Sequence, residues 1–339
     1  MQIHITYTGG TIGMVSTQNG LAPGADLRGW LDHVIAGTQL ISEQVSFTQL
    51  GPLIDSSNAT PENWQAIIDD LRANRNKADA FIVLHGTDTM AYTAAALSYA
   101  LSDFGKPVIL TGSQLPIGRI ESDATANVTG ALNAALSMRA VGVFVFFGHH
   151  LFLGSRVTKR SSWAFEGFDS PAAPPAARTG APWRWYPVQA DGQGWANPKP
   201  YRRHDVAVID MVPGITAKRV AALLDPLPEA VLVRGYGVGN LPADEPGLTD
   251  IFARAIEAGV PVAVGSQCTQ AVVLLGRYET GDAIAKAGAV GTADMTLEAA
   301  YAKIVFLLSQ GLRGKDVAAW MTRPLAGELT ATSAEGSGR

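Results

Sequence analysis

The sequence predicts an α/β protein of two α/β domains. The larger N-terminal domain has a mostly parallel sheet with helices on both faces, and the C-terminal domain is smaller. Three observations support this prediction. Short apolar runs alternate with helical patterns up to residue 147, an order typical of parallel sheets. Seven prolines and little periodicity mark residues 171–200, and the alternation resumes at residue 206.

In the N-terminal domain, short apolar runs predict strands and longer segments with helical spacing predict helices. The strands are expected at 3–6, 45–53, 80–84, 108–110 and 141–147. The helices are expected at 61–71, 89–101 and 122–138. Thr60 is a suitable N-cap for the first of these helices, and Pro61 suits its first position.

The C-terminal domain repeats this alternation on a smaller scale. Its strands are expected at 206–209, 230–233 and 260–264, and its helices at 216–224, 248–255 and 297–308. The predicted domains are an N-terminal domain at 1–185, a linker at 186–205, a C-terminal domain at 206–330 and a disordered tail at 331–339. Trp183 and Trp185 are expected to pack the proline-rich segment onto the first domain, because large aromatic side chains bury much apolar area.

Composition excludes several classes of protein. The 339 residues carry a net charge of −4 at pH 7, without the basic stripe that a nucleic-acid partner requires. The longest apolar runs are too short to span a bilayer, so we expect no membrane partner. Cys268 is the single cysteine and is expected to be a small buried residue. The absence of a leader pattern favours the cytoplasm, with a secreted protein that has lost its leader as the alternative.

A threonine between glycines follows the first strand, in the stretch YTGGTIGM (7–14). Ligands of open α/β sheets bind beyond the carboxyl ends of the strands, where glycines allow close backbone approach. Thr11 lies at such a place, and the loop LHGTDTM (84–90) puts Thr87 and Asp88 at the same edge. A threonine hydroxyl needs a base to become a nucleophile, and Lys159 is the candidate. The alternatives are a simple turn at Thr11 and a solvated surface lysine at position 159.

Taken together, these stretches resemble bacterial L-asparaginases of the cytoplasmic type I. The resemblance runs in order from Met1 to about Leu329, and the combination of TGGTI with HGTDT is strongly specific. The other matching stretches are DSS (55–57), TGSQLP (111–116), TK (158–159), YGVGN (236–240) and GTADMTLEA (291–299).

The resemblance implies a role for each residue of a catalytic site. Thr11 would be the nucleophile, which forms an acyl-enzyme and releases ammonia. Lys159 would polarise Thr87, and Thr87 would activate the attacking water. Asp88 would receive the α-ammonium of the substrate as a paired charge.

The resemblance also implies groups that hold the substrate. Asp55 and Ser56 would bind the α-carboxylate and the amine. Backbone N–H groups around Gly10 and Thr87 would stabilise the oxyanion, which is usually a large contribution to catalysis.

Two further points of comparison with the type I family concern a proton-relay residue and a regulatory site. Type I asparaginases often have a tyrosine where this chain has Leu21, and leucine has no hydroxyl to relay a proton. Tyr278, in the stretch GRYETGD, is the candidate replacement, with simple packing as the alternative. Thr158, Arg234 and Cys268 match a regulatory asparagine site that some type I relatives possess.

The resemblance implies hydrolysis of L-asparagine to L-aspartate and ammonia by a homodimer or homotetramer that uses no cofactor. No HExxH or CxxC pattern is present, so we expect no metal. A glutaminase-asparaginase of broad specificity is one alternative, because one methylene in a pocket is worth only about 1–3 kcal/mol. A catalytically weak asparagine-binding sensor is another. A third, an amidotransferase component that feeds ammonia to glutamyl-tRNA, would carry an extra N-terminal domain.

Overall fold

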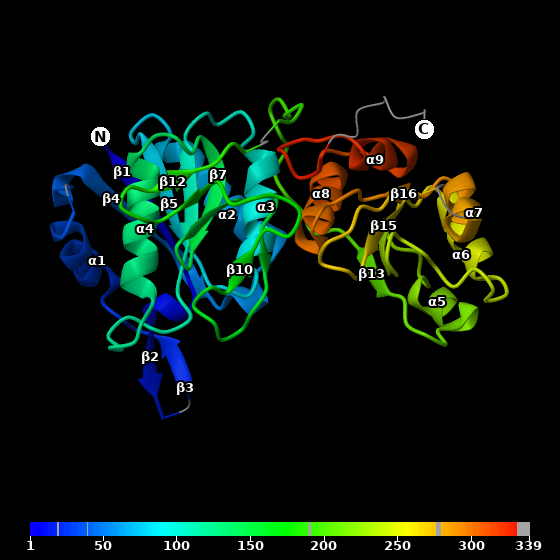
Figure 1. Ribbon diagram of the computed structural model, residues 1–339, viewed down its shortest axis with the longest axis horizontal. Coiled ribbons are helices and arrows are strands. Elements are labelled where there is room, and N and C mark those ends of the chain that lie inside the picture. The colour runs from blue at the N-terminus through cyan, green and yellow to red at the C-terminus, as the bar shows by residue number, and fades with distance from the viewer. Residues whose placement is uncertain (19, 39, 189–190, 276–278, 331–339) are drawn as a thin grey trace. The chain divides into compact units, whose positions relative to one another are not determined.

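The computed structural model describes residues 1–18, 20–38, 40–188, 191–275 and 279–330. It divides into two compact units, unit 1 (Met1–Val188) and unit 2 (Gln189–Arg339). Both units are built from a sheet and helices (Figure 1). The predicted fold class, a larger domain with a mostly parallel sheet followed by a smaller α/β domain, is confirmed.

Unit 1 contains an eight-stranded sheet in the order β12-β11-β8-β7-β6-β5-β1-β4. Five neighbouring strands, from β4 to β7, are parallel, and the remaining three are antiparallel. The strand bounds are β1 (Ile3–Gly9), β4 (Val45–Ile54), β5 (Ala80–Leu84), β6 (Pro107–Thr111), β7 (Gly142–Phe147), β8 (His150–Leu153), β11 (Ala177–Arg178) and β12 (Arg184–Trp185).

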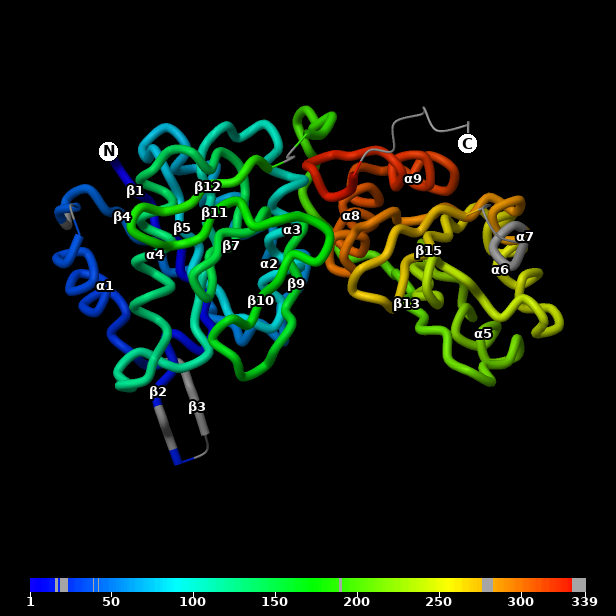
Figure 2. The backbone as a smooth tube through the Cα atoms, in the orientation of Figure 1, coloured from blue at the N-terminus to red at the C-terminus, as the bar shows by residue number. Residues whose placement is uncertain are grey.

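Helices cover both faces of this sheet, and the side chains of β1 show which helix covers which face. Ile3 and Ile5 belong to one core cluster with apolar residues of α1 and α4. His4 and Thr6, which point to the other face, hydrogen-bond to Asp70 of α2. Figure 2 shows the same arrangement in the course of the chain. The helix bounds are α1 (Leu27–Ala36), α2 (Pro61–Asn74), α3 (Met90–Ala100) and α4 (Ala124–Leu136).

The expected start of α2 is confirmed. Thr60 is its N-cap and forms a capping box with Asn63, and Pro61 occupies the first turn. This arrangement uses backbone N–H groups that have no partner within the helix.

Two short strand pairs lie outside the main sheet. The antiparallel hairpin of β2 (Met14–Thr17) and β3 (Gly20–Pro23) projects from the body of unit 1 (Figure 1). The pair of β9 (Thr158–Lys159) and β10 (Phe168–Asp169) is also antiparallel. Each pair matters for the site described below, because one follows Thr11 and the other carries Lys159.

Unit 2 is a second, smaller α/β unit with a parallel sheet in the order β13-β14-β15-β16. Its core joins apolar side chains of these strands with those of α5 and α6. The strands are β13 (Val206–Asp210), β14 (Ala230–Gly235), β15 (Val262–Ser266) and β16 (Val290–Gly291). The helices are α5 (Ala217–Leu223), α6 (Leu248–Glu257), α7 (Glu279–Ala287), α8 (Leu297–Ser309) and α9 (Gly314–Met321).

The proline-rich segment packs onto the two units in separate parts. Trp183 and Trp185 stack on one another and contact the core of unit 1, as the sequence predicts. The division between the two units falls within the predicted linker, 186–205, after Val188. Trp195 packs edge-on against Phe306 of α8, with ring centroids 5.6 Å apart. Aromatic burial therefore ties part of the predicted linker into unit 2.

A fully buried ion pair fixes the chain after α9 to α8 within unit 2. Lys303 and Glu328 have side chains that are both 0% exposed, and they hydrogen-bond to each other. The Glu328 carboxylate also accepts the backbone N–H groups of Leu325 and Ala326, at 2.9 and 2.8 Å. Burial lowers the pKa of Lys303, and the charge of Glu328 opposes that effect. Each charge therefore depends on the other.

Lys303→Met is expected to lower the free energy of unfolding by about 3–5 kcal/mol, because it leaves a buried carboxylate without its counter-charge. Arg28→Met is the matched control, since Arg28 pairs with Asp32 on the surface, where the two side chains are 43% and 41% exposed. The control is expected to cost less than about 1 kcal/mol. Urea unfolding followed by circular dichroism measures both, and equal losses would contradict a stabilising role for the buried pair.

Candidate active site

Two glycines bring the ends of β1 and β5 into direct contact. A Cβ atom placed on Gly10 would lie 2.4 Å from Cα and 2.5 Å from N of Gly86, so neither loop leaves room for a side chain there. Gly10 also has a φ of +90°, which L-residues rarely adopt. Thr11 and Thr87 each follow one of these glycines. The backbone segments that lead into the two threonines predicted to act in catalysis are therefore in direct contact.

A third loop, after β4, joins the first two. Gly10 N donates to Ile54 O at 3.1 Å, which fixes the end of β4 beside the Thr11 turn. Ser56 is 2% exposed, and its Oγ accepts the backbone N–H of Asp88 at 3.2 Å. Thr89 Oγ1 donates to Ser56 O at 2.7 Å. The predicted site residues of the first three strand-end loops thus form one connected group.

Lys159 reaches this group from β9. Its Nζ donates to Thr87 Oγ1 at 2.8 Å and to Asp88 Oδ1 at 2.7 Å. The Thr87 residue is buried, the Lys159 side chain is 16% exposed and that of Asp88 is 59% exposed. A shielded lysine therefore contacts a buried hydroxyl, and the carboxylate at its other side is open to solvent. This arrangement puts the amino group of Lys159 within hydrogen-bonding distance of both a buried hydroxyl, on Thr87, and an open carboxylate, on Asp88.

Gln114 belongs to the same group, although the sequence did not single it out. Its Oε1 lies 3.5 Å from Thr87 Oγ1, and its Nε2 donates to Ala164 O at 3.0 Å and to Ser161 O at 3.3 Å. Gln114 thus links Thr87 to the loop that follows Lys159. The sequence did contain a signal for Gln114, since the matching stretch TGSQLP comes after β6, at the same edge of the parallel sheet as the other loops.

His85 orients the peptide between Gly86 and Thr87. It is 1% exposed, and burial lowers its pKa, so the ring is neutral. Its Nδ1 lies 2.7 Å from Gly86 O, and its Nε2 lies 3.0 Å from Thr93 Oγ1. We assign the proton to Nδ1, because a carbonyl oxygen only accepts. In a trans peptide the N–H points opposite to the C=O, so the N–H of Thr87 points away from His85.

Two family models match almost the whole chain. One is described as "Asparaginase, N-terminal" and matches residues 2–189. The other is described as "Glutaminase/Asparaginase C-terminal domain" and matches residues 205–321. The chain belongs to the asparaginase family.

Individual relatives agree with this assignment. L-asparaginase 1 of Escherichia coli is 40% identical over 334 residues, which cover 97% of this chain and 98% of that protein. The crystal structure of L-asparaginase I from Vibrio cholerae superimposes with a TM-score of 0.84 at 38% identity, covering 97% of this chain and 99% of that one. A glutamyl-tRNA(Gln) amidotransferase protein of Pyrococcus horikoshii is 31% identical, covering 82% of this chain but only 65% of that longer protein.

The structure also gives the positions of Asp55 and Leu21, two further residues that the sequence singles out. Asp55 is exposed, and its carboxylate accepts the backbone N–H of Ser57 at 3.2 Å, as a local cap. Leu21 lies in β3, where it is paired in register with Ser16. Tyr278, the proposed replacement for the missing tyrosine, lies outside the described residues.

The predicted regulatory residues are divided between the two units. Thr158 is in β9 of unit 1, whereas Arg234 and Cys268 are in unit 2. Arg234 forms an ion pair with Asp210 at 3.0 Å, and its Nε is buried without a hydrogen-bond partner among the described residues. The expectation that Cys268 is buried is wrong. Its strand, β15, ends at Ser266, and the chain leaves the sheet before Cys268, which is exposed.

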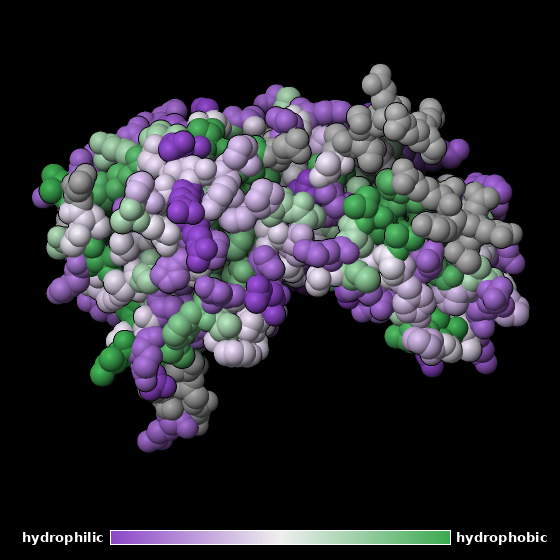
Figure 3. Space-filling model, in the orientation of Figure 1, coloured by the Kyte–Doolittle hydropathy of each residue, from purple (hydrophilic) through white to green (hydrophobic). Residues whose placement is uncertain are grey.

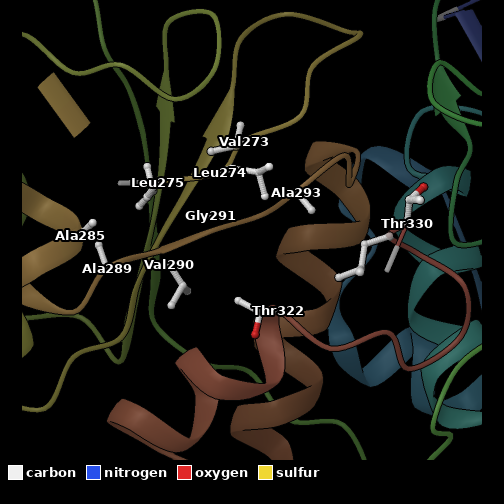
Figure 4. Close-up of a pocket in the computed structure, with 11 residues that line it drawn as sticks. Val273, Leu274, Leu275, Ala285, Ala289, Val290, Gly291, Ala293, Thr322 and Thr330 are labelled. Atoms are coloured by element: carbon white, nitrogen blue, oxygen red, sulfur yellow. The ribbon is translucent and has the colours of Figure 1, made fainter. Parts of the chain in front are cut away.

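A cavity of about 270 Å³ in unit 2 is lined mainly by aliphatic residues, with no titratable side chain (Figure 4). Within the described ranges, no group of three or more His, Cys, Asp or Glu could hold a metal ion. None of the described helices is long and apolar enough to cross a membrane. On the face of unit 1 shown in Figure 3, hydrophilic and hydrophobic residues are interspersed.

Gly10→Ala is expected to destabilise the protein by about 1–3 kcal/mol more than Gly118→Ala, because only the first substitution forces a side chain into a packed backbone. Gly118 is the matched control, since it has a similar φ of +84° but open space where a Cβ would lie. Urea unfolding of both variants measures the difference. Equal destabilisation would mean that backbone strain alone explains Gly10, and that the contact with Gly86 is not tight.

Proposed function

We propose that this protein hydrolyses L-asparagine to L-aspartate and ammonia, with Thr11 as the nucleophile. The observation that carries the proposal is the contact of Gly10 with Gly86, because these glycines precede Thr11 and Thr87, and Lys159 contacts both Thr87 and Asp88. The family to which the chain belongs supports the same reaction.

In the first half of the reaction, Thr11 Oγ attacks the side-chain amide carbon of asparagine. The carbonyl oxygen becomes an oxyanion, which backbone N–H groups around Gly10 and Thr87 stabilise from fixed positions; the N–H of Gly10 itself is not among them, because it donates to Ile54 O. The C–N bond then breaks, the proton of the Thr11 hydroxyl ends on the leaving nitrogen, and ammonia departs. The product of this half is an aspartyl ester of Thr11.

In the second half, water attacks the carbonyl carbon of that ester. Thr87 takes a proton from the water and passes its own to Lys159 Nζ, which lies 2.8 Å away and must enter this step as a neutral amine. The ester bond breaks, and the proton returns to Thr11 as aspartate leaves. General acid–base help of this kind is typically worth about 10²–10⁴-fold.

Substrate binding uses the open side of the same group. Asp88 is 59% exposed, so its carboxylate can pair with the α-ammonium of asparagine. The Ser56 hydroxyl, which accepts the N–H of Asp88, donates its proton to the α-carboxylate, and the Asp55 carboxylate beside it binds the amine. Because Lys159 and the substrate ammonium share one carboxylate, substrate binding and the base are coupled through Asp88.

A broader glutaminase-asparaginase is the second candidate, and the C-terminal family model, whose description includes glutaminase, favours it. The alternative of a catalytically weak asparagine-binding sensor stays a prediction, and it rests on the missing hydroxyl at Leu21. The cytoplasmic location, the homodimer or homotetramer, and the regulatory role of Thr158, Arg234 and Cys268 also stay predictions.

Thr11→Ala is expected to lower kcat for L-asparagine by at least about a hundredfold, because the variant loses the atom that forms the acyl-enzyme. Thr322→Ala, which removes an exposed hydroxyl in unit 2, is the matched control and should keep wild-type turnover. Ammonia release by the purified proteins measures both, with L-glutamine and D-asparagine as further substrates. Near-normal turnover of the Thr11 variant, with unchanged melting, would remove Thr11 from its role.

Lys159→Met and Asp88→Ala are expected to affect different quantities, turnover in the first variant and aspartate binding in the second. Lys159→Met should abolish turnover and still bind aspartate, because only the proton acceptor is lost. Asp88→Ala should weaken aspartate binding by more than about thirtyfold, because the α-ammonium loses a charge partner worth about 2 kcal/mol or more. Asp103→Asn, which alters an exposed carboxylate paired with Arg72, is the control. Calorimetric affinity within twofold of wild type for Asp88→Ala would contradict its assignment.

A further inference from the structure

We propose that Tyr7 is a positioning residue for the reaction: its side chain fixes Gly13, the residue that joins the Thr11 turn to both ends of the β2–β3 hairpin. The inference rests on the proposed function, in which Thr11 is the nucleophile. Tyr7 lies on β1, within the core of unit 1, and does not touch the reacting atoms in this account.

Gly13 is connected to both the Thr11 turn and the β2–β3 hairpin. It ends the 3₁₀ turn Thr11–Gly13, and its N–H donates to Gly10 O at 3.2 Å. The hairpin begins at the next residue. Where the hairpin ends, the N–H groups of Gly24 and Ala25 both donate to Gly13 O at 3.2 Å. Any displacement of Gly13 therefore moves both the nucleophile turn and the base of the hairpin.

The backbone of Gly13 does not itself require glycine. Its φ lies outside the left-handed region, in contrast to the φ of +90° at Gly10. The obstacle to a side chain is Tyr7. A Cβ atom on Gly13 would lie 1.9 Å from the Tyr7 Oη and 2.7 Å from its Cζ, closer than real contacts allow. The hydroxyl of Tyr7 thus fills the space that a Cβ would need.

Tyr7 cannot easily give way. It is 3% exposed and stacks on Phe47, with ring centroids 6.5 Å apart. Burial raises the pKa of its phenol, so the side chain stays neutral over the range in which the enzyme would work. A close-packed ring of this kind acts as a fixed stop, because core side chains have few empty spaces to move into.

Misplacement of a catalytic group by about 1 Å can lower turnover by about a hundredfold. If Tyr7 sets the position of Gly13, a methyl group between them must push either the ring or the turn. The ring is confined by the core, so the turn that carries Thr11 is expected to move. A shorter side chain at position 7 would then make room for the methyl group, and the turn would return to its original position.

The experiment is a double-mutant cycle on ammonia release from L-asparagine. Gly13→Ala is expected to lower kcat by about tenfold or more, and Tyr7→Leu combined with Gly13→Ala should recover to within about threefold of Tyr7→Leu alone. Tyr7→Phe should rescue only in part, because the ring atom nearest Gly13 remains. Gly37→Ala is the matched control, since its Cβ would meet the nearest atom at an ordinary 3.5 Å. It is expected to keep the wild-type kcat.

Two results would overturn the inference. One is a Gly13→Ala variant with kcat within twofold of wild type. The other is a defect that Tyr7→Leu does not relieve. A merely structural contact would couple the two positions in urea unfolding and leave kcat per folded molecule unchanged, which also contradicts a positioning role. If the wild-type protein releases no ammonia, the proposed function fails instead, and the unfolding cycle still decides whether Tyr7 and Gly13 collide.

Discussion

The close approach of Gly10 to Gly86 is the constraint on which the rest of the site depends. It is possible only because β1 and β5 are parallel neighbours that end at the same edge, and because neither residue carries a Cβ. The end of β4 is tied to the same point by the hydrogen bond from Gly10 N to Ile54 O. One backbone contact therefore brings together the three loops that carry Thr11, Ser56 and Thr87, and Lys159 reaches Thr87 from β9.

The two sides of the site are supported in different ways. On one side, Thr11 sits on a short turn whose last residue, Gly13, rests against the confined ring of Tyr7. On the other side, Thr87 is held by side chains, since Lys159 donates to it and Gln114 lies at the limit of a hydrogen bond. In the proposed reaction, packing thus positions Thr11, the nucleophile, and polar contacts position Thr87, which activates the water. Both devices fix geometry before substrate arrives, which is what electrostatic catalysis requires.

The sequence predicted the fold class and the edge of the sheet that carries the site, because both follow from local patterns. Alternating strands and helices imply a parallel sheet, and the loops of Thr11 and Thr87 follow strands. The pairing order that sets β1 between β4 and β5 is a tertiary property, and so the contact of the two glycines was not predictable. Cys268 was misjudged because residue type favours burial, whereas its position beyond the end of β15 decides its exposure. The link made by Gln114 was missed because it depends on a distant loop.

The central claim is that Thr11 forms a covalent ester during turnover, and the most direct test is to find that ester. Acid quenching of the enzyme during hydrolysis of L-asparagine, followed by mass spectrometry of the intact chain and its peptides, measures it. The account predicts an added aspartyl group on the peptide that contains Thr11, and none in Thr11→Ala. An aspartyl group on another residue would contradict it, as would the absence of any adduct on Lys159→Met, the variant in which hydrolysis of the ester is expected to be blocked.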